Sequence, residues 1–240
     1  MLLAMKNNSR PWAYWTSQPT PPAVNGRLIK LPKLKVGGRK IARHNRGSNT
    51  GYLFDPISFV FRECESDKEL AAVLIAFAEK DIVSVVCQAP AFDYVDEEGV
   101  ARTTYFDLLL TFADGRTIVV MVKTSERAWK KDIARQAAHI AGQLDGFADA
   151  VRLVTEADMP AWLVHNARLF HSVRQDPTNH LDEQVHARAV ELACDLPISE
   201  LLSPFDGGFR SAARLLFSGR LVSVKPERIF PETEVRAAPL

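Results

Sequence analysis

The chain has no long apolar run and little cysteine. Of its 240 residues 47% are hydrophobic, yet no stretch of about 18 consecutive apolar residues occurs, as a membrane-spanning helix requires. The three cysteines, Cys64, Cys87 and Cys194, show neither CxxC nor any other metal-site spacing. We therefore expect a cytoplasmic protein with reduced cysteines and without a leader or a membrane span.

Motifs for several common activities are also missing. The chain contains no P-loop, no GxGxxG, no zinc-finger pattern and no internal repeat. The histidines are scattered, and the pairs His165/His171 and His180/His186 lie six residues apart. Two metal ligands on one helix need i, i+4 spacing, so we expect the histidines to have core or surface roles.

Acidic residues are absent from the first 54 positions, which contain ten lysines and arginines. The remaining 186 residues carry 20 basic and 29 acidic side chains, so the net charge of +1 hides a strong asymmetry. A basic segment attracts polyanions, and Trp12, Tyr14 and Trp15 suit stacking or packing. We predict an N-terminal arm, residues 1–50, that contacts DNA; a solvated tail or a targeting peptide is the alternative. The DNA-binding candidates are Arg27, Lys30, Lys33, Lys35, Arg39, Lys40, Arg43 and Arg46.

The most informative stretch is 104–123, TYFDLLLTFADGRTIVVMVK, in which two apolar strands flank a tight turn. Asp107 lies inside the run FDLLL, and Lys123 ends the second strand. A carboxylate in such apolar surroundings costs several kcal/mol unless a cation or hydrogen bonds compensate it. Asp107 is therefore a candidate site residue.

The turn decides which residues of the second strand can meet Asp107. A two-residue loop at 114–115 would place Asp107 opposite Val122. A three-residue loop at 113–115 instead places Asp107 opposite Met121 and Tyr105 opposite Lys123. We prefer the longer loop because its third residue is glycine, which tolerates positive φ.

A strand carboxylate, a hairpin and a second strand ending in lysine resemble the core of the PD-(D/E)XK nuclease superfamily. The surroundings resemble one branch of it, the TnsA-like endonucleases of heteromeric transposons. The similar features run from about residue 47 to about 235. They are Gly51 with FDP at 54–56, ESDKE at 65–69, QAP at 88–90, Asp107 with VMVK at 120–123, VTE at 154–156, a helix at 166–169 and the segment 197–224.

The resemblance implies an α/β fold: a restriction-endonuclease-like mixed sheet flanked by helices in 51–160, and a small helical, winged-helix-like domain in 161–240. It implies a Mg²⁺- or Mn²⁺-dependent endonuclease subunit that cuts one strand at each transposon end. Glu69, Asp107 and Lys123 would be catalytic, and Glu69, Asp107 and the Val122 carbonyl would hold the metal. The implied partners are double-stranded DNA, a DDE-type transposase subunit and an ATPase regulator.

Two residues depart from the family pattern. Phe106 replaces a proline, and Met121 replaces the acidic or amide residue two positions before the lysine. A thioether is a soft, poor ligand for Mg²⁺. The alternative is therefore a catalytically weakened or inactive DNA-binding or assembly subunit, or an accessory protein that kept only the fold. Ser125-Glu126 and Gln136 are further oxygen donors that could replace Met121.

Glu69 has two interpretations. Ser66 and Glu69 form a capping box ahead of an apolar helical stripe, so Glu69 could satisfy the Ser66 amide alone. The resemblance favours metal ligation, with Glu63 and Glu65 as weaker candidates.

The remaining patterns predict a sheet and two helical regions. We expect an extended segment at 53–62, a meander of strands at 82–87, 91–95, 102–112 and 117–123, a helix at 126–147 with Trp129 on its apolar face, and a parallel strand at 151–154. Beyond these, the patterns predict helices at 161–173, 181–194, 198–202 and 209–217 and a strand at 221–224. Arg210 and Arg214 are the only expected bidentate readers of bases in the last helix.

Overall fold

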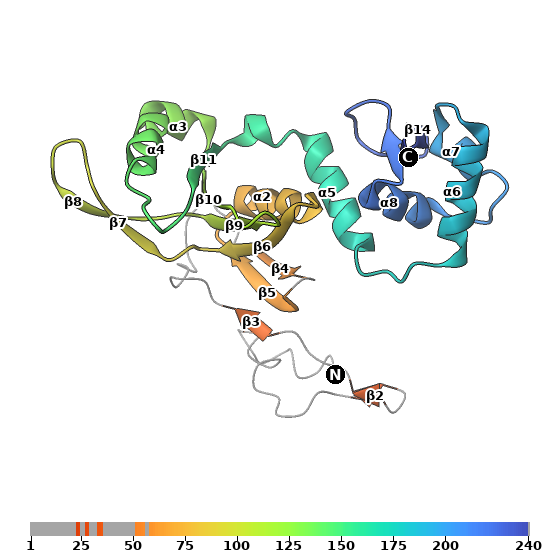
Figure 1. The fold of residues 1–240 in the computed structure, drawn as a ribbon, viewed down its shortest axis with the longest axis horizontal. Helices are drawn as coiled ribbons and strands as arrows, with labels where there is room; N and C mark the ends of the chain where they lie inside the picture. Colours follow the sequence, from red (N-terminus) through yellow and green to blue (C-terminus); the bar gives the residue numbers. More distant parts are fainter. Residues whose placement is uncertain (1–22, 25–26, 29–32, 36–50, 56–57, 240) are drawn as a thin grey trace.

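The computed structural model describes residues 23–24, 27–28, 33–35, 51–55 and 58–239. The described chain is mixed α/β, with a helix-flanked sheet and a separate C-terminal group of helices (Figure 1). Most of the basic arm lies outside the described residues. Only the backbone of three short strands is described there, β1 (Ala23–Val24), β2 (Arg27–Leu28) and β3 (Lys33–Lys35).

The central sheet of the described chain has four strands in the order β11-β10-β9-β6. Their bounds are Ile82–Cys87 for β6, Leu108–Phe112 for β9, Thr117–Val122 for β10 and Ala150–Val154 for β11. β10 is antiparallel to β9 and parallel to β11, and β6 is antiparallel to β9. The predicted mixed sheet is confirmed.

Helices cover both faces of this sheet. Helix α2 (Asp67–Ala78) packs against Val120 and Val122 on one face, whereas α4 (Ile133–Ala141) packs against Val119 and Met121 on the other. Helix α3 (Ser125–Lys130) and α4 together form the crossover that the parallel β10–β11 pair requires. Burial on both faces explains why β10 reads as an unbroken apolar run.

The β9–β10 turn has the predicted three-residue loop. Thr111 pairs with Thr117, and the Phe112 and Arg116 main chains are joined by an N–H···O bond of 2.8 Å. Gly115 adopts φ +89° and donates its N–H to the Phe112 carbonyl, 3.0 Å away. A side chain at this φ would be strained, which is why glycine occupies the position.

The expected continuous strand at 102–112 is wrong, because the chain breaks at Phe106 and Asp107. Strands β7 (Ala91–Val95) and β8 (Ala101–Tyr105) form a separate two-stranded ribbon, which projects from the sheet in Figure 1. Tyr105 pairs with Ala91 in this ribbon and not with Lys123. The result is one long hairpin, β6–β7 against β8–β9, that bends where the two sheets meet.

The expected single helix at 126–147 is also wrong. Asp132 adopts φ +45°, which ends α3 and starts α4 in a new direction. Helix α4 ends at Ala141, followed by Gly142. Because of this break, Trp129 does not share the buried stripe of α4 and is 88% exposed.

The segment before α2 is a hairpin and not a single extended strand. Strands β4 (Gly51–Asp55) and β5 (Val60–Cys64) pair antiparallel, and β3 pairs parallel to β5. The carboxylate of Asp55 accepts two hydrogen bonds from the buried Arg62 guanidinium, at 2.6 and 2.9 Å. This hairpin leads directly into the α2 cap at Ser66.

The C-terminal group has its own apolar core. A three-stranded sheet of order β12-β14-β13 packs with helices α6, α7 and α8, and α5 (Ala161–Val173) connects the group to β11 through a short 3-10 turn, η2 (Glu156–Asp158). The bounds are α6 His180–Leu192, β12 Leu196–Pro197, α7 Ile198–Leu202, α8 Phe209–Ser218, β13 Leu221–Ser223 and β14 Glu234–Ala237. The predicted helices are present, and the sequence patterns missed β12 and β14.

None of the helices in the described ranges combines the length and the apolar character needed to cross a membrane.

Candidate active site

The three predicted catalytic residues come from three elements that meet at the bend of the hairpin. Glu69 lies in the first turn of α2, Asp107 directly precedes β9, and Lys123 directly follows β10. The Lys123 Nζ lies 2.7 Å from Asp107 Oδ2. Gln88 connects Glu69 to Asp107, because its side-chain amide donates to Glu69 Oε2 and its main-chain N–H donates to the Asp107 carbonyl.

The charge of Asp107 is compensated by hydrogen bonds and by a lysine. Its Oδ2 accepts hydrogen bonds from the Val122 N–H at 2.6 Å and from Lys123 Nζ, and the same ammonium donates to the Val122 carbonyl at 3.1 Å. The Lys123 side chain is 22% exposed and that of Asp107 is 10% exposed. This partly buried ion pair fixes the position of the Lys123 side chain, which solvent still reaches.

The ladder between β9 and β10 becomes irregular at this carboxylate. Leu108 pairs with Val120, yet the Asp107 N–H also bonds to the Val120 carbonyl, at 2.9 Å. Asp107 and Leu108 on one strand therefore both lie opposite Val120 on the other, which is the arrangement of a β-bulge. The irregularity turns the Asp107 carboxylate toward the end of β10, so Asp107 is not a simple cross-strand partner of Met121.

Glu69 serves as a cap and is linked to Asp107 through Gln88. The Ser66 hydroxyl donates to its Oε1, and its Oε2 accepts from the Glu65 N–H at 2.9 Å and from the Gln88 amide at 3.1 Å. Burial raises the pKa of Glu69, the Glu65 N–H lowers it, and the Asp107 charge raises it again, with a net increase. The amide that Glu69 caps belongs to Glu65, one residue before the expected Ser66.

Sequence reasoning noted Gln88 only as part of QAP at 88–90 and assigned it no role in the site. It is 1% exposed and adopts φ +53°, a conformation that is uncommon outside glycine and costs on the order of 1 kcal/mol. Its main-chain N–H bonds to the Asp107 carbonyl at 2.8 Å, while its side chain bonds to Glu69. The available signal was a polar residue between a buried strand and Pro90.

A divalent metal fits this donor set in part. In the ranges that the structure covers, no three His, Cys, Asp or Glu side chains form a metal-binding group. The hard oxygens are those of Glu69, Asp107 and the Val122 carbonyl, and Asp107 Oδ1 accepts no hydrogen bond from a described residue. Mg²⁺ commonly binds through one or two carboxylates and keeps several waters, so these donors are of the right type, and the fit is partial because no third side-chain ligand from the described residues joins them.

Met121 does not contribute a ligand. Its side chain is 4% exposed and packs with Phe106, Val119 and Ile140 beneath α4. The further oxygen donors considered above are engaged elsewhere, because the Gln136 amide bonds to the Tyr94 hydroxyl, 2.9 Å away, and the exposed Glu126 pairs with Lys130.

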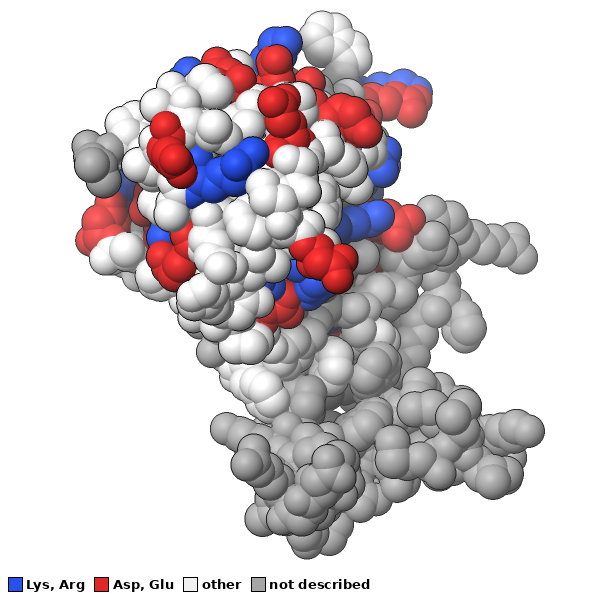
Figure 2. Space-filling model, turned by 90° about the vertical axis from the view of Figure 1, so that its right-hand side faces the viewer, with Lys and Arg blue, Asp and Glu red and all other residues white. Residues whose placement is uncertain are grey.

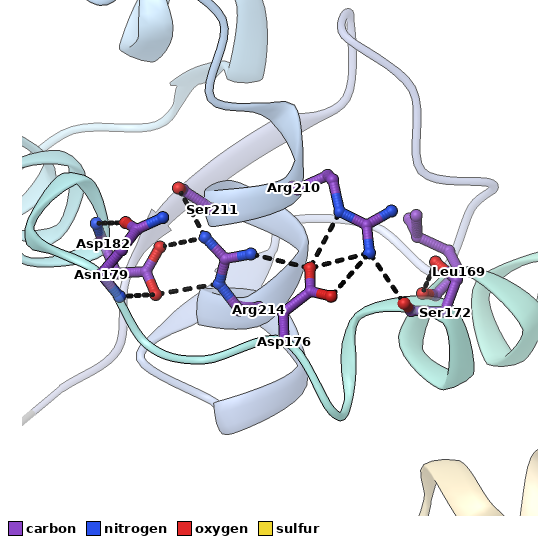
Figure 3. A network of polar contacts seen from close by, with 8 residues as sticks. All are labelled: Leu169, Ser172, Asp176, Asn179, Asp182, Arg210, Ser211 and Arg214. Carbon is purple, nitrogen blue, oxygen red and sulfur yellow. Dashed lines mark hydrogen bonds and ion pairs between the residues drawn. The ribbon is translucent and has the colours of Figure 1, made fainter. Parts of the chain in front are cut away.

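The two arginines expected to read bases pair with carboxylates of the C-terminal region (Figure 3). Arg214 forms a bidentate pair with Asp182, at 2.9 and 2.7 Å, and also contacts Asp176. Arg210 forms a bidentate pair with Asp176 and donates to the Ser172 carbonyl. Both guanidiniums are thus engaged by carboxylates, although the Arg210 side chain is 57% exposed and only that of Arg214, 12% exposed, is largely buried.

The surface of this group carries no uniform positive charge on the face seen in Figure 2, where acidic and basic side chains alternate. Arg220 is paired with Glu183, and Arg236 lies 3.5 Å from Asp195. The side chains of the predicted DNA-binding residues in the basic arm lie outside the described residues.

Comparisons of the chain with models of known protein families and with curated proteins find no match.

Proposed function

We propose that this protein is a divalent-metal-dependent DNA endonuclease of the TnsA-like kind, with a restriction-endonuclease-like fold. The observation that carries the proposal is the meeting of Asp107, Lys123 and Glu69 at the bend of a mixed sheet. A buried carboxylate that holds a lysine and faces a second carboxylate is a costly arrangement, and costly ionisable clusters occur preferentially at functional sites.

The site residues divide the chemistry between them. Glu69, Asp107 and the Val122 carbonyl would bind the metal, which when bound stabilises charge on the phosphate and activates water. Lys123, oriented by Asp107, would place its ammonium against the scissile phosphate or the attacking water. Gln88 orients Glu69 through its amide and holds the Asp107 backbone, so it acts as a positioning residue.

The architecture is in keeping with this proposal. The order β6-β9-β10-β11, with α2 on one face and a crossover on the other, is the layout that the resemblance implies. In the C-terminal group the chain order is helix, strand, helix, helix, strand, strand, as in winged-helix units. Because both α8 arginines are paired with carboxylates, we assign this group to docking on a transposase subunit or an ATPase regulator and not to reading DNA.

A second candidate is a DNA-binding and assembly subunit with a weakened metal site. It is favoured by the burial of Met121 and by the three hydrogen bonds that Glu69 already accepts, because a metal must displace some of them. Both candidates share the Asp107–Lys123 pair, and they differ in whether the purified chain cuts DNA.

The test is nicking of supercoiled plasmid by the full chain with Mg²⁺ or Mn²⁺. Asp107→Asn should abolish nicking. Asp114→Asn is the matched control, since Asp114 is an exposed turn carboxylate paired only with neighbouring Arg116 among the described residues. Wild-type protein that binds DNA and Mn²⁺ without nicking would establish the second candidate. Undiminished nicking by Asp107→Asn would refute the site.

A further inference from the structure

The outer face of the β7–β8 ribbon is exposed along its whole length. The pairs that share this face are Ala91/Tyr105, Asp93/Thr103 and Val95/Ala101. All six side chains are exposed, whereas Phe92 and Tyr94 of the other face pack with the cluster beneath α4. Val95, Val100 and Tyr105 are three of the eight large apolar side chains that are exposed in the described chain. Apolar surface thus gathers on a two-stranded sheet, which is marginally stable by itself.

The main chain of β8 has an open edge. The Asp96 N–H donates to the Val100 carbonyl at 2.8 Å, and bonded and non-bonded pairs alternate along an antiparallel ladder. Counted from this bond, the main chain of Arg102 faces β7, whereas the N–H and C=O groups of Ala101 and Thr103 point away from it. No described residue bonds to these outward groups, and both residues are exposed. They are therefore free to pair with another strand.

The edge of β7 is closed at Val95 by side chains. The Gln143 amide accepts the Val95 N–H and donates to the Val95 carbonyl, both at 2.9 Å. His139 Nε2 lies 2.7 Å from the same carbonyl. The amide takes the place of a neighbouring strand, so a further strand cannot run along β7. Natural sheets protect their open edges with lysine, proline or a bulge, and β8, ARTTY, has none of these.

The charge of the ribbon selects the kind of partner. Residues 91–105 contain four acidic side chains and one basic side chain. The acids are Asp93, Asp96, Glu97 and Glu98, and the base is Arg102. A ribbon with this excess of negative charge repels a nucleic acid, so the partner of the open edge is a protein strand.

A second copy of β8 satisfies the open edge in one antiparallel register. Groups that point outward must meet groups that point outward, so odd-numbered residues pair with odd-numbered residues. A two-fold axis at Thr103 pairs this residue with its own counterpart and places Ala101 opposite the second copy's Tyr105. Arg102 then lies opposite Thr104. An axis at Arg102 would place two guanidiniums opposite each other, which is destabilising, and an axis at Thr104 would leave Ala101 without a partner.

We propose that this protein forms a dimer by antiparallel pairing of two β8 strands, which joins the ribbons into a four-stranded sheet. The contact is isologous, with the same five residues contributed by each copy. The ribbon projects from the central sheet in Figure 1, so a second ribbon can lie along it. Two five-residue strands form a small contact beside the roughly 1,200–2,000 Å² that stable interfaces bury, so we expect a reversible dimer. The proposal goes beyond the nuclease function and does not depend on it.

Sedimentation equilibrium of the full chain over a range of concentrations tests the dimer. Thr103→Pro removes the outward N–H but no bond of the β7–β8 ladder. It should raise the dissociation constant at least about tenfold, because each copy loses one main-chain hydrogen bond. Thr103→Val is the matched control, since it removes the same hydroxyl, with its 2.6 Å bond to Asp93, and keeps the N–H. It should dimerise like the wild type.

Two results of this experiment would overturn the dimer. One is a Thr103→Pro protein that is folded by circular dichroism and dimerises as tightly as the wild type. The other is a wild-type chain that stays monomeric at every concentration, which would assign the open edge to a strand of another protein.

Cross-linking tests the register without a proline in the ribbon. At the two-fold axis the two Cα atoms would lie about 5.5 Å apart, within the range of a disulfide. Thr103→Cys, in a Cys194→Ser background that removes the exposed native thiol, should therefore form an intermolecular disulfide when diamide oxidises the two thiols. Arg102→Cys is the control, because its counterpart lies diagonally about 7–8 Å away.

Cross-linking of Arg102→Cys at least as fast as Thr103→Cys, or no cross-linking of either, overturns the register. Plasmid nicking by the same wild-type protein is measured separately. A dimer that never nicks would refute the nuclease and keep the β8 contact, and a monomer that nicks would do the reverse.

Discussion

Replacing Met121 tests whether this position, two residues before the lysine, belongs to the core or to the metal site. The side chain is 4% exposed in the cluster beneath α4. Met121→Leu nearly conserves volume and should cost less than about 1.5 kcal/mol of unfolding free energy. Met121→Gln has a similar shape but buries an amide among apolar groups, at a cost of about 1–3 kcal/mol.

Met121→Glu should be the most destabilising of the series. Burial disfavours the ionised form, so the folded-state pKa of the new carboxyl should lie above its unfolded value. The folded state then binds the proton more tightly, so the variant should be most stable below the ordinary glutamate pKa and lose stability as pH rises through the raised pKa. At pH 8 we expect a cost of several kcal/mol relative to Met121→Leu.

Urea unfolding at pH 5 and pH 8 measures these differences, and calorimetry with Mn²⁺ measures metal binding. The buried placement predicts that Met121→Glu loses stability between the two pH values and that neither polar variant binds Mn²⁺ more tightly than wild type. A Met121→Glu protein as stable as Met121→Leu at pH 8, with increased Mn²⁺ affinity, would refute the reasoning. The residue would then face the metal centre.

Three further predictions follow from the site, the C-terminal group and the arm. Asp107→Asn should lower the pKa of Glu69 in a carbon-13 NMR titration, because a like charge disappears; an unchanged pKa would show that the carboxyls do not interact. Arg214→Met should cost about 3 kcal/mol in urea unfolding at pH 7, because it leaves Asp182, 3% exposed, without its main partner. Burial raises the pKa of Asp182, but hydrogen bonds, above all the one from Arg214, outweigh it and hold this pKa below the ordinary value. The stability cost of Arg214→Met should therefore decrease in acid, where the Asp182 carboxyl becomes protonated. A cost that does not change with pH would count against the ion pair. Removing residues 1–46 should reduce the salt dependence of DNA binding by several units of log–log slope, whereas equal slopes would place the arm off the DNA.

Local chemistry was readable from the sequence wherever neighbours along the chain decide the structure. Gly115 specified the three-residue loop because positive φ is costly for other residues, and the loop in turn set the β9–β10 register. Ser66 marked the start of α2, and apolar periodicity located α5 and α7 at their observed bounds. The apolar surroundings of Asp107 indicated that a cation or hydrogen bonds compensate it, and the structure shows both, from Lys123 and from the Val122 N–H.

Contacts between distant segments decided the rest. The bend at Gln88 depends on main-chain bonds to Phe106 and Asp107, almost 20 residues away, and the local signal, a polar residue shortly before Pro90, does not specify a bend. Apolar residues at helical spacing indicate a helix, but they do not show whether it is one helix or two. The sequence pattern therefore could not reveal the break at Asp132, which leaves Trp129 exposed. Arginines are ambiguous in sequence because the same guanidinium binds phosphate or carboxylate equally well. Only the tertiary structure, by placing Asp176 and Asp182 beside α8, showed that both of its arginines pair with carboxylates of the protein.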